Sequence, residues 1–131
     1  METFTVSTKS RNQLIDITSE VTGVIRESGV SDGACIVFTP HTTAGITINE
    51  NADPSVKSDI SMKLSDVIDQ DSRFRHMEGN SDSHIKSSLV GCSEYIIVEG
   101  GRPVLGTWQG IMFCEFDGPR SRRVHVQVVG E

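Results

Sequence analysis

Long apolar runs and a targeting leader are missing from this chain of 131 residues. No stretch approaches the ~20 apolar residues that a membrane-spanning helix needs. Residues 1–6 contain neither the basic region nor the apolar core of a secretory signal. The sequence therefore predicts a cytoplasmic protein without membrane contact, and its length predicts one domain, residues 1–131.

Paired cysteines are missing as well. Cys35, Cys92 and Cys114 are odd in number, widely spaced and without a Cys-x-x-Cys pair. Cys35 and Cys114 lie in apolar, strand-like runs, which predicts buried, reduced thiols. Reduced thiols are typical of a cytosolic protein.

Positive charge is scarce. The chain has 12 Lys and Arg against 18 Asp and Glu, a formal net charge of −6. This balance disfavours nucleic acid and anionic membranes as partners unless basic residues gather locally. Only Arg120, Arg122 and Arg123 do so, and that cluster is too small for a nucleic-acid duplex.

Two common catalytic motifs are absent. No Gly-x-Ser-x-Gly nucleophile turn is present, so a covalent hydrolase is disfavoured, and we interpret the Thr42 and Thr43 hydroxyls as binding or turn groups. No Gly-x-Gly-x-x-Gly motif is present either, so Gly100-Gly101 indicates only a turn.

The sequence does contain strand patterns around two helical segments. Alternating or continuous apolar character predicts strands near residues 3–9, 33–39, 44–50, 95–98, 107–117 and 124–128. Helices are predicted from an N-cap at Thr18 to Gly29, and from Asp53-Pro54 along an apolar stripe to Ile68. Residues 69–83 predict a functional or mobile loop, and 85–90 a short helical turn. The fold class is therefore α+β: a single compact domain with mixed or antiparallel β-sheets, sandwich-like, and two main helices.

Residues 106–123 hold many of the functional candidates. In a strand, the even positions from Trp108 to Phe116 are apolar or small, so we expect them in the core. The odd positions place Glu115 beside Phe113, where a carboxylate is costly to bury without a partner. Asp117-Gly-Pro ends the strand and arginines follow. These groups can form a site at a strand end; a core strand followed by a solvated basic turn is the alternative.

Three of the four histidines, His41, His76 and His84, lie at polar junctions. Imidazole is the commonest metal ligand and a natural acid or base near neutrality. Their spacing matches no helical His-x-x-x-His or zinc-finger pattern, so spacing alone leaves a metal site open. His125 alternates with valines in the last strand, and we interpret it as a surface residue.

The polar run from Asn49 to Asp53 joins a strand to a helix N-terminus. Free backbone N–H groups favour an anion there, although Glu50 and Asp53 would repel a phosphate unless a cation bridges them. A cap and turn is the alternative interpretation.

Three segments, taken in order, resemble one known family. They are residues 41–53 (HTTAGITINENAD), 78–86 (EGNSDSHIK) and 105–120, which contains LGTWQG and EFDGPR. The chain resembles the YjbQ-like family, labelled secondary thiamine-phosphate synthase enzymes, from Phe4 to Val128. One departure is Ser83, where the family often has alanine.

The resemblance implies a compact α+β homotrimer with its site near subunit boundaries. It also implies a weak thiamine-phosphate synthase activity, a transferase reaction that joins a pyrimidine pyrophosphate to a thiazole phosphate and releases pyrophosphate. The implied partners are thus a phosphorylated small molecule and two further copies of the chain.

The resemblance also implies roles for residues at matching positions. The catalytic set is His41, His84 and Glu115. A divalent metal, Mg²⁺ or Zn²⁺, would be held by His41, His76 and His84. The substrate-binding set is Thr42, Asn49, Glu50, Asp53, Asn80, Trp108, Gln109, Asp117, Arg120 and Arg122. We expect one shared pocket, in which arginine clamps phosphate. A metal-assisted hydrolase and a non-enzymatic protein that binds a metabolite or a metal are the alternatives.

Overall fold

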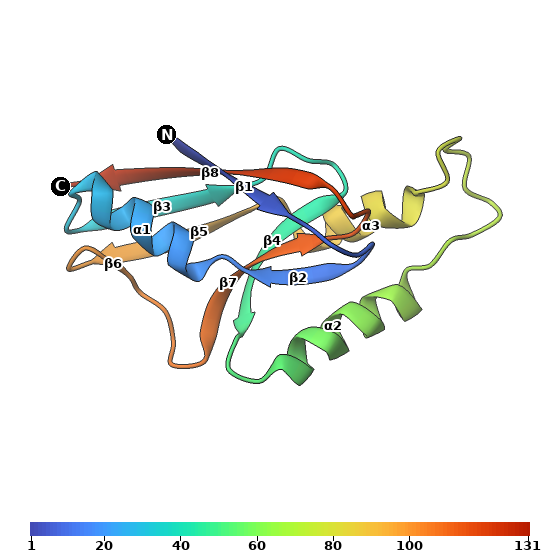
Figure 1. The fold of residues 1–131 in the computed structure, drawn as a ribbon, viewed down its shortest axis with the longest axis horizontal. Helices are drawn as coiled ribbons and strands as arrows, with labels where there is room; N and C mark the ends of the chain where they lie inside the picture. Colours follow the sequence, from blue (N-terminus) through green and yellow to red (C-terminus); the bar gives the residue numbers. More distant parts are fainter.

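Two antiparallel β-sheets face each other in the computed structural model, which describes residues 1–131 (Figure 1). The larger sheet has the order β1-β8-β3-β5-β6, and the smaller has the order β2-β7-β4. The larger sheet comprises β1 (Glu2–Ser7), β8 (Ser121–Gly130), β3 (Gly33–Phe38), β5 (Ser93–Glu99) and β6 (Arg102–Pro103). The smaller comprises β2 (Gln13–Asp16), β7 (Gln109–Glu115) and β4 (Ala44–Glu50). The predicted α+β class with sandwich-like antiparallel sheets is confirmed.

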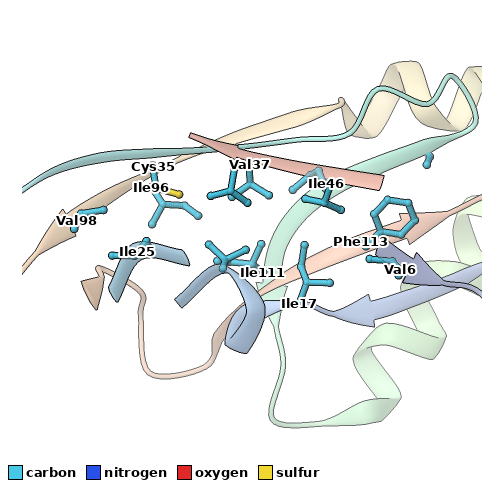
Figure 2. Close-up of a cluster of buried hydrophobic side chains, with 14 residues drawn as sticks. Val6, Ile17, Ile25, Cys35, Val37, Ile46, Ile96, Val98, Ile111 and Phe113 are labelled. Carbon is cyan, nitrogen blue, oxygen red and sulfur yellow. The ribbon is translucent and has the colours of Figure 1, made fainter. Parts of the chain in front are cut away.

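Strand alternation determines which side chains meet between the sheets. Val37 of β3 and Ile96 of β5 lie opposite Ile46 of β4 and Phe113 of β7 in one buried cluster (Figure 2). Because successive residues of a strand point to opposite faces, each strand of the larger sheet gives one face to this core and the other to solvent.

Strand β7 differs from the prediction in the face that it turns to the core. Ile111 and Phe113, at odd positions, belong to the central cluster, whereas Met112 and Cys114 are buried on the opposite face. Both faces of β7 are buried, whereas the prediction assigned only the even-numbered residues to the core. The prediction of a core Trp108 is wrong: this residue precedes β7 in a turn and is 64% exposed.

Helix α1 (Thr18–Ser28) closes one end of the core with Val21 and Ile25. It ends at Gly29, whose φ of 73° suits glycine. The predicted N-cap, Thr18, is instead the first helical residue. Its N–H donates to the Asp16 carboxylate at 2.9 Å, so an acid two residues upstream satisfies the helix start.

Helix α2 (Pro54–Val67) begins as predicted, with the Asp53 carboxylate accepting the Ser55 N–H at 2.9 Å. None of its residues is fully buried, and the helix lies at the side of the body near β2 (Figure 1).

Helix α3 (Ser81–Val90) is a third helix, longer than the predicted turn at 85–90. Its buried residues are all polar: Asp82, Ser83, Lys86 and Ser87. The Ser83 hydroxyl donates to the Phe116 carbonyl and the Ser87 hydroxyl to the Ala44 carbonyl, each at 2.6 Å. Apolar Leu89 is exposed. Apolar periodicity did not reveal this helix because its polar side faces the sheet.

The cysteines are free, and Cys35 and Cys114 are buried as predicted. Burial raises the pKa of Cys35 to about 11 and that of Cys114 to about 12, so both remain thiols at neutral pH. Among the helices, none has the length and apolar character needed to cross a bilayer.

Candidate functional site

A polar cavity of about 390 Å³ lies where the segments after β3 and β7 meet the start of α3. It contains no hydrophobic lining residue. Most of the predicted site residues line it: His41, Thr42, His76, Asn80, His84, Asp117, Arg120 and Arg122. Three segments that are distant in the sequence thus supply one cavity.

Local structure explains each of these positions. Pro40 cannot donate to a strand ladder, so β3 ends before it and His41 leaves the sheet. Asn80 precedes α3 as its N-cap residue and His84 follows one turn later. Asp117 and Arg120 lie in the turn between β7 and β8.

A buried ion pair forms the base of the cavity. Glu115 is fully buried and Arg122 is 4% exposed. Arg122 Nε donates to Glu115 Oε1 at 2.8 Å, and Arg122 Nη2 donates to the other carboxylate oxygen and to Thr43 Oγ1. The Thr8 hydroxyl and the Asp117 N–H donate to the same carboxylate at 2.7 and 3.0 Å. Glu115 therefore positions Arg122 from behind and does not line the cavity.

The pKa of Glu115 follows from these contacts. Burial alone would raise it, but the hydrogen bonds from Arg122, the Asp117 N–H and Thr8 outweigh burial, so the pKa is lowered. The carboxylate stays ionised and keeps the Arg122 charge balanced.

Asp117 joins the two sides of the cavity. Its Oδ2 accepts from Asn80 Nδ2 at 2.7 Å and from Arg120 Nη2 at 2.9 Å. The other amide atom of Asn80, Oδ1, is buried and has no hydrogen-bond partner. A buried acceptor without a partner is costly, which marks this corner of the cavity as a place for a ligand donor.

His41 is held in one protonation state. Its Nε2 accepts the backbone N–H of Arg123 at 2.9 Å, so the ring carries its hydrogen on Nδ1 and is neutral. Burial, and then the charges of Arg122 and Arg123, lower its pKa. His41 is therefore an N–H donor and not a general base in this arrangement.

His76 and His84 lie edge to face, with ring centroids 5.3 Å apart, and His76 Nε2 lies 3.9 Å from Glu78 Oε2. Nowhere in the chain are three or more His, Cys, Asp or Glu side chains placed to hold a metal ion. The Nε2 of His41 is also already engaged. The three predicted ligands thus share a cavity without forming a ligand set as placed, and the divalent metal stays a prediction.

The remaining predicted residues lie elsewhere. In the β4–β7 ladder Ala44 pairs with Glu115 and Glu50 pairs with Gln109, so these pairs lie at opposite ends of the strands, roughly 20 Å apart. Asn49, Glu50, Asp53, Trp108 and Gln109 are at the far end from the cavity. The expected single shared pocket is therefore not formed within one chain, and substrate contact by these residues stays a prediction.

Several supporting residues carry little or no signal in the sequence. Thr8 lies in a segment whose pattern predicts only a strand, and the pattern around Thr43 does not specify its partner, yet both side chains hydrogen-bond the buried ion pair. Arg11 clamps Asp82 of α3 with bonds of 3.0 and 3.1 Å. Glu78 also lines the cavity. Its place in residues 78–86, one of the three segments that resemble the family, was the only feature of the sequence that pointed to it.

Comparisons with known proteins agree over nearly the full chain. The family model described as UPF0047 protein YjbQ-like matches residues 2–131. A UPF0047 protein of Methanocaldococcus jannaschii is 57% identical over 128 residues, covering 98% of this chain and 93% of the relative. UPF0047 protein YugU of Bacillus subtilis is 51% identical over 131 residues, covering 99% of each chain.

Solved structures give the same result. A YjbQ/UPF0047 protein of Clostridium acetobutylicum superposes with a TM-score of 0.96 at 53% identity, covering 98% of this chain and all of that one. A YbjQ-like protein of Sulfolobus solfataricus reaches a TM-score of 0.95 at 32% identity, covering 99% of this chain and 96% of that one. The chain therefore belongs to the UPF0047 YjbQ-like family.

Proposed function

We propose that the chain binds a phosphate-bearing small molecule in the histidine–arginine cavity and acts on it there. The observation that carries this proposal is the gathering of His41, His76, His84 and Arg120 around one polar cavity above a neutralised Arg122. Arg120 donates hydrogen bonds from Nε and Nη2 to Asp117, whereas its Nη1 forms no hydrogen bond within the protein. The positioned guanidinium therefore has donors left for a phosphate oxygen.

The reaction we propose is thiamine-phosphate formation in a cytoplasmic setting. The thiazole nitrogen forms a bond to the pyrimidine methylene carbon, and the bond from that carbon to pyrophosphate breaks, leaving its electron pair on pyrophosphate. Charge develops on the leaving oxygen, where Arg120 and the His41 N–H would stabilise it. His84 would supply a proton to that oxygen.

The surroundings of His84 support a substrate with two parts. His84 also lines two adjoining hollows of about 540 and 510 Å³. These volumes are in the range of small-molecule pockets, so one residue faces space for both an anionic group and an organic group.

Pyrophosphate affinity tests the proposal. We expect Arg120→Gln to bind pyrophosphate about 10–150-fold more weakly in isothermal titration calorimetry, since a hydrogen bond to a charged group contributes ~1.5–3 kcal/mol. The matched control is Arg102→Gln, an exposed arginine on β6 that should not change affinity. Equal affinities in wild type and Arg120→Gln would contradict a phosphate site here.

The metal is a separate prediction, and no step above depends on it. From the resemblance we expect one divalent ion per chain in the purified protein, and its loss from His84→Ala. Elemental analysis of both proteins measures this. If the wild-type protein contains no stoichiometric metal, the metal prediction is wrong, and the roles left to the three histidines are proton transfer and hydrogen bonding.

The homotrimer is also proposed, and the outer face of the larger sheet supports self-association. Tyr95, Ile97 and Val129 are at least half exposed there, and apolar patches of this kind mark interaction surfaces. Light scattering should give a mass three times the 14.3 kDa of one chain. A wild-type mass of one chain would refute the trimer.

A further inference from the structure

A second polar groove, of about 450 Å³, lies between α2 and the segment that enters β2. It shares no residue with the candidate site. Ser58, Ser61 and Ser65 of α2 form one wall, Lys57 lies beside them, and Asn12 lies across the groove. None of the lining residues is acidic.

A buried ammonium group lies directly behind this groove. Lys86 of α3 is 1% exposed, and its Nζ donates to Asn12 Oδ1 and Ser65 Oγ, each at 3.1 Å. Both acceptors are neutral, and no carboxylate lies within ion-pair distance of Nζ. Asp82, one turn earlier on α3, is held by Arg11. The charge of Lys86 therefore lacks a direct partner.

The energetics agree with this geometry. Burial lowers the pKa of Lys86, Asp82 raises it in part, and Arg11 lowers it again. A buried cation is costly unless it is paired, so an anion close to Nζ would remove an existing penalty.

The two side chains that accept a hydrogen bond from Lys86, Asn12 and Ser65, each also have a donor that can reach a ligand. Because Ser65 Oγ accepts from the ammonium, its own hydrogen is available to another acceptor. Asn12 uses Oδ1 for Lys86, and its Nδ2 forms no hydrogen bond. The side chains of Lys57 and Ser61 form none either. Donors without partners thus converge on the groove from α2 and from the segment before β2.

We propose that this groove is an oxyanion-binding site that takes a small phosphate monoester. Ser65 and Asn12 relay the charge of Lys86 to the phosphate, while Ser61 and Lys57 contact it from the rim. Leu14 and Met62 also line the groove and would pack against an apolar substituent of the ester. Such a ligand would bridge α2 to the rest of the protein at a helix that has no fully buried residue.

Methionine methyl groups allow a test that separates the two sites. Met62 lines the groove, whereas Met77 lies beside His76 and Glu78 and is fully exposed. In protein labelled with [¹³C-methyl]methionine, phenyl phosphate should shift the Met62 methyl signal saturably. Sodium chloride at equal ionic strength and phenol should not shift it.

The variants used here leave Lys86 in place, and circular dichroism checks that each is folded, because Ser65→Ala removes one acceptor of the buried ammonium. Lys57→Gln should weaken the Met62 titration about fivefold, as expected for one partly solvated charge. Ser61→Ala with Ser65→Ala should weaken it at least about tenfold, since both hydroxyl donors to a charged group are lost. Arg120→Gln should leave it unchanged.

Three outcomes would overturn the groove site: an unmoved Met62 signal, a linear response that chloride reproduces, or equal titrations in wild type and the Ser61→Ala/Ser65→Ala protein. A response at Met77 alone would support the candidate site and refute the groove. A saturable response at Met62 alone would support the groove site.

Discussion

Replacing Glu115 with alanine should lower the free energy of unfolding by about 3–5 kcal/mol, because it leaves Arg122 buried and without its counter-charge. Arg122 is 4% exposed and makes its ion pair with Glu115 alone. Thr8 and the Asp117 N–H would also lose their acceptor. For a chain of this size the loss corresponds to roughly 10–20 °C in Tm. Urea unfolding followed by circular dichroism measures it.

The matched control removes both charges. Glu115→Leu with Arg122→Met should cost less than Glu115→Ala alone, since no unpaired charge remains. If the single and double variants lose equal stability, cavity formation and not charge is the cause.

The pH dependence has a defined sign. The pKa of Glu115 is lowered below its ordinary value of 4.5, so its contribution is full above that pH and is lost as pH falls toward the folded value. The stability gap between wild type and Glu115→Gln should therefore narrow below pH 4.5. A gap that stays constant would contradict the ion-pair explanation.

Replacing His84 with asparagine should lower the rate of pyrimidine–thiazole coupling at least about 100-fold, which is the usual contribution of a general acid. His84 lines the cavity together with Arg120, and His41 cannot take its place while Nε2 accepts from the backbone. The effect should fall on kcat more than on KM, because pyrophosphate contacts remain.

His125→Asn is the matched control, since His125 lies on the outer sheet face bonded to Thr3 and stacked on Phe38. Its rate should equal that of wild type. If His84→Asn also turns over at the wild-type rate, coupling is incidental and the cavity serves binding alone.

Local patterns were sufficient to predict the central strands and the start of α2. The alternation in residues 44–50 predicts β4, and the Asp53-Pro54 pair predicts the start of α2. Both signals depend only on residues close together in the sequence, and both elements are present in the structure. Strand β2 was not predicted because its four residues, Gln13–Asp16, are stabilised by pairing with the distant β7. Tertiary context decides such short strands.

The sequence predicted which residues belong to the candidate site better than it predicted how they are arranged. His41, Asn80, His84 and Arg120 come together as the recognised segments indicated. Gln109 and Glu115 were expected in one shared pocket, yet they are the first and last residues of β7. Glu115 pairs with Arg122 behind the cavity, and no sequence pattern specifies that partner.

Helix α3 ties the shape of the cavity to the pairing of two strands. Its inward bonds run from Ser87 to the Ala44 carbonyl and from Ser83 to the Phe116 carbonyl, across sequence separations of 43 and 33 residues. Ala44 is the first residue of β4 and Phe116 directly follows β7, and these two strands pair with each other. The position of the helix that carries His84, and with it the shape of the cavity, therefore depends on how β4 and β7 are paired.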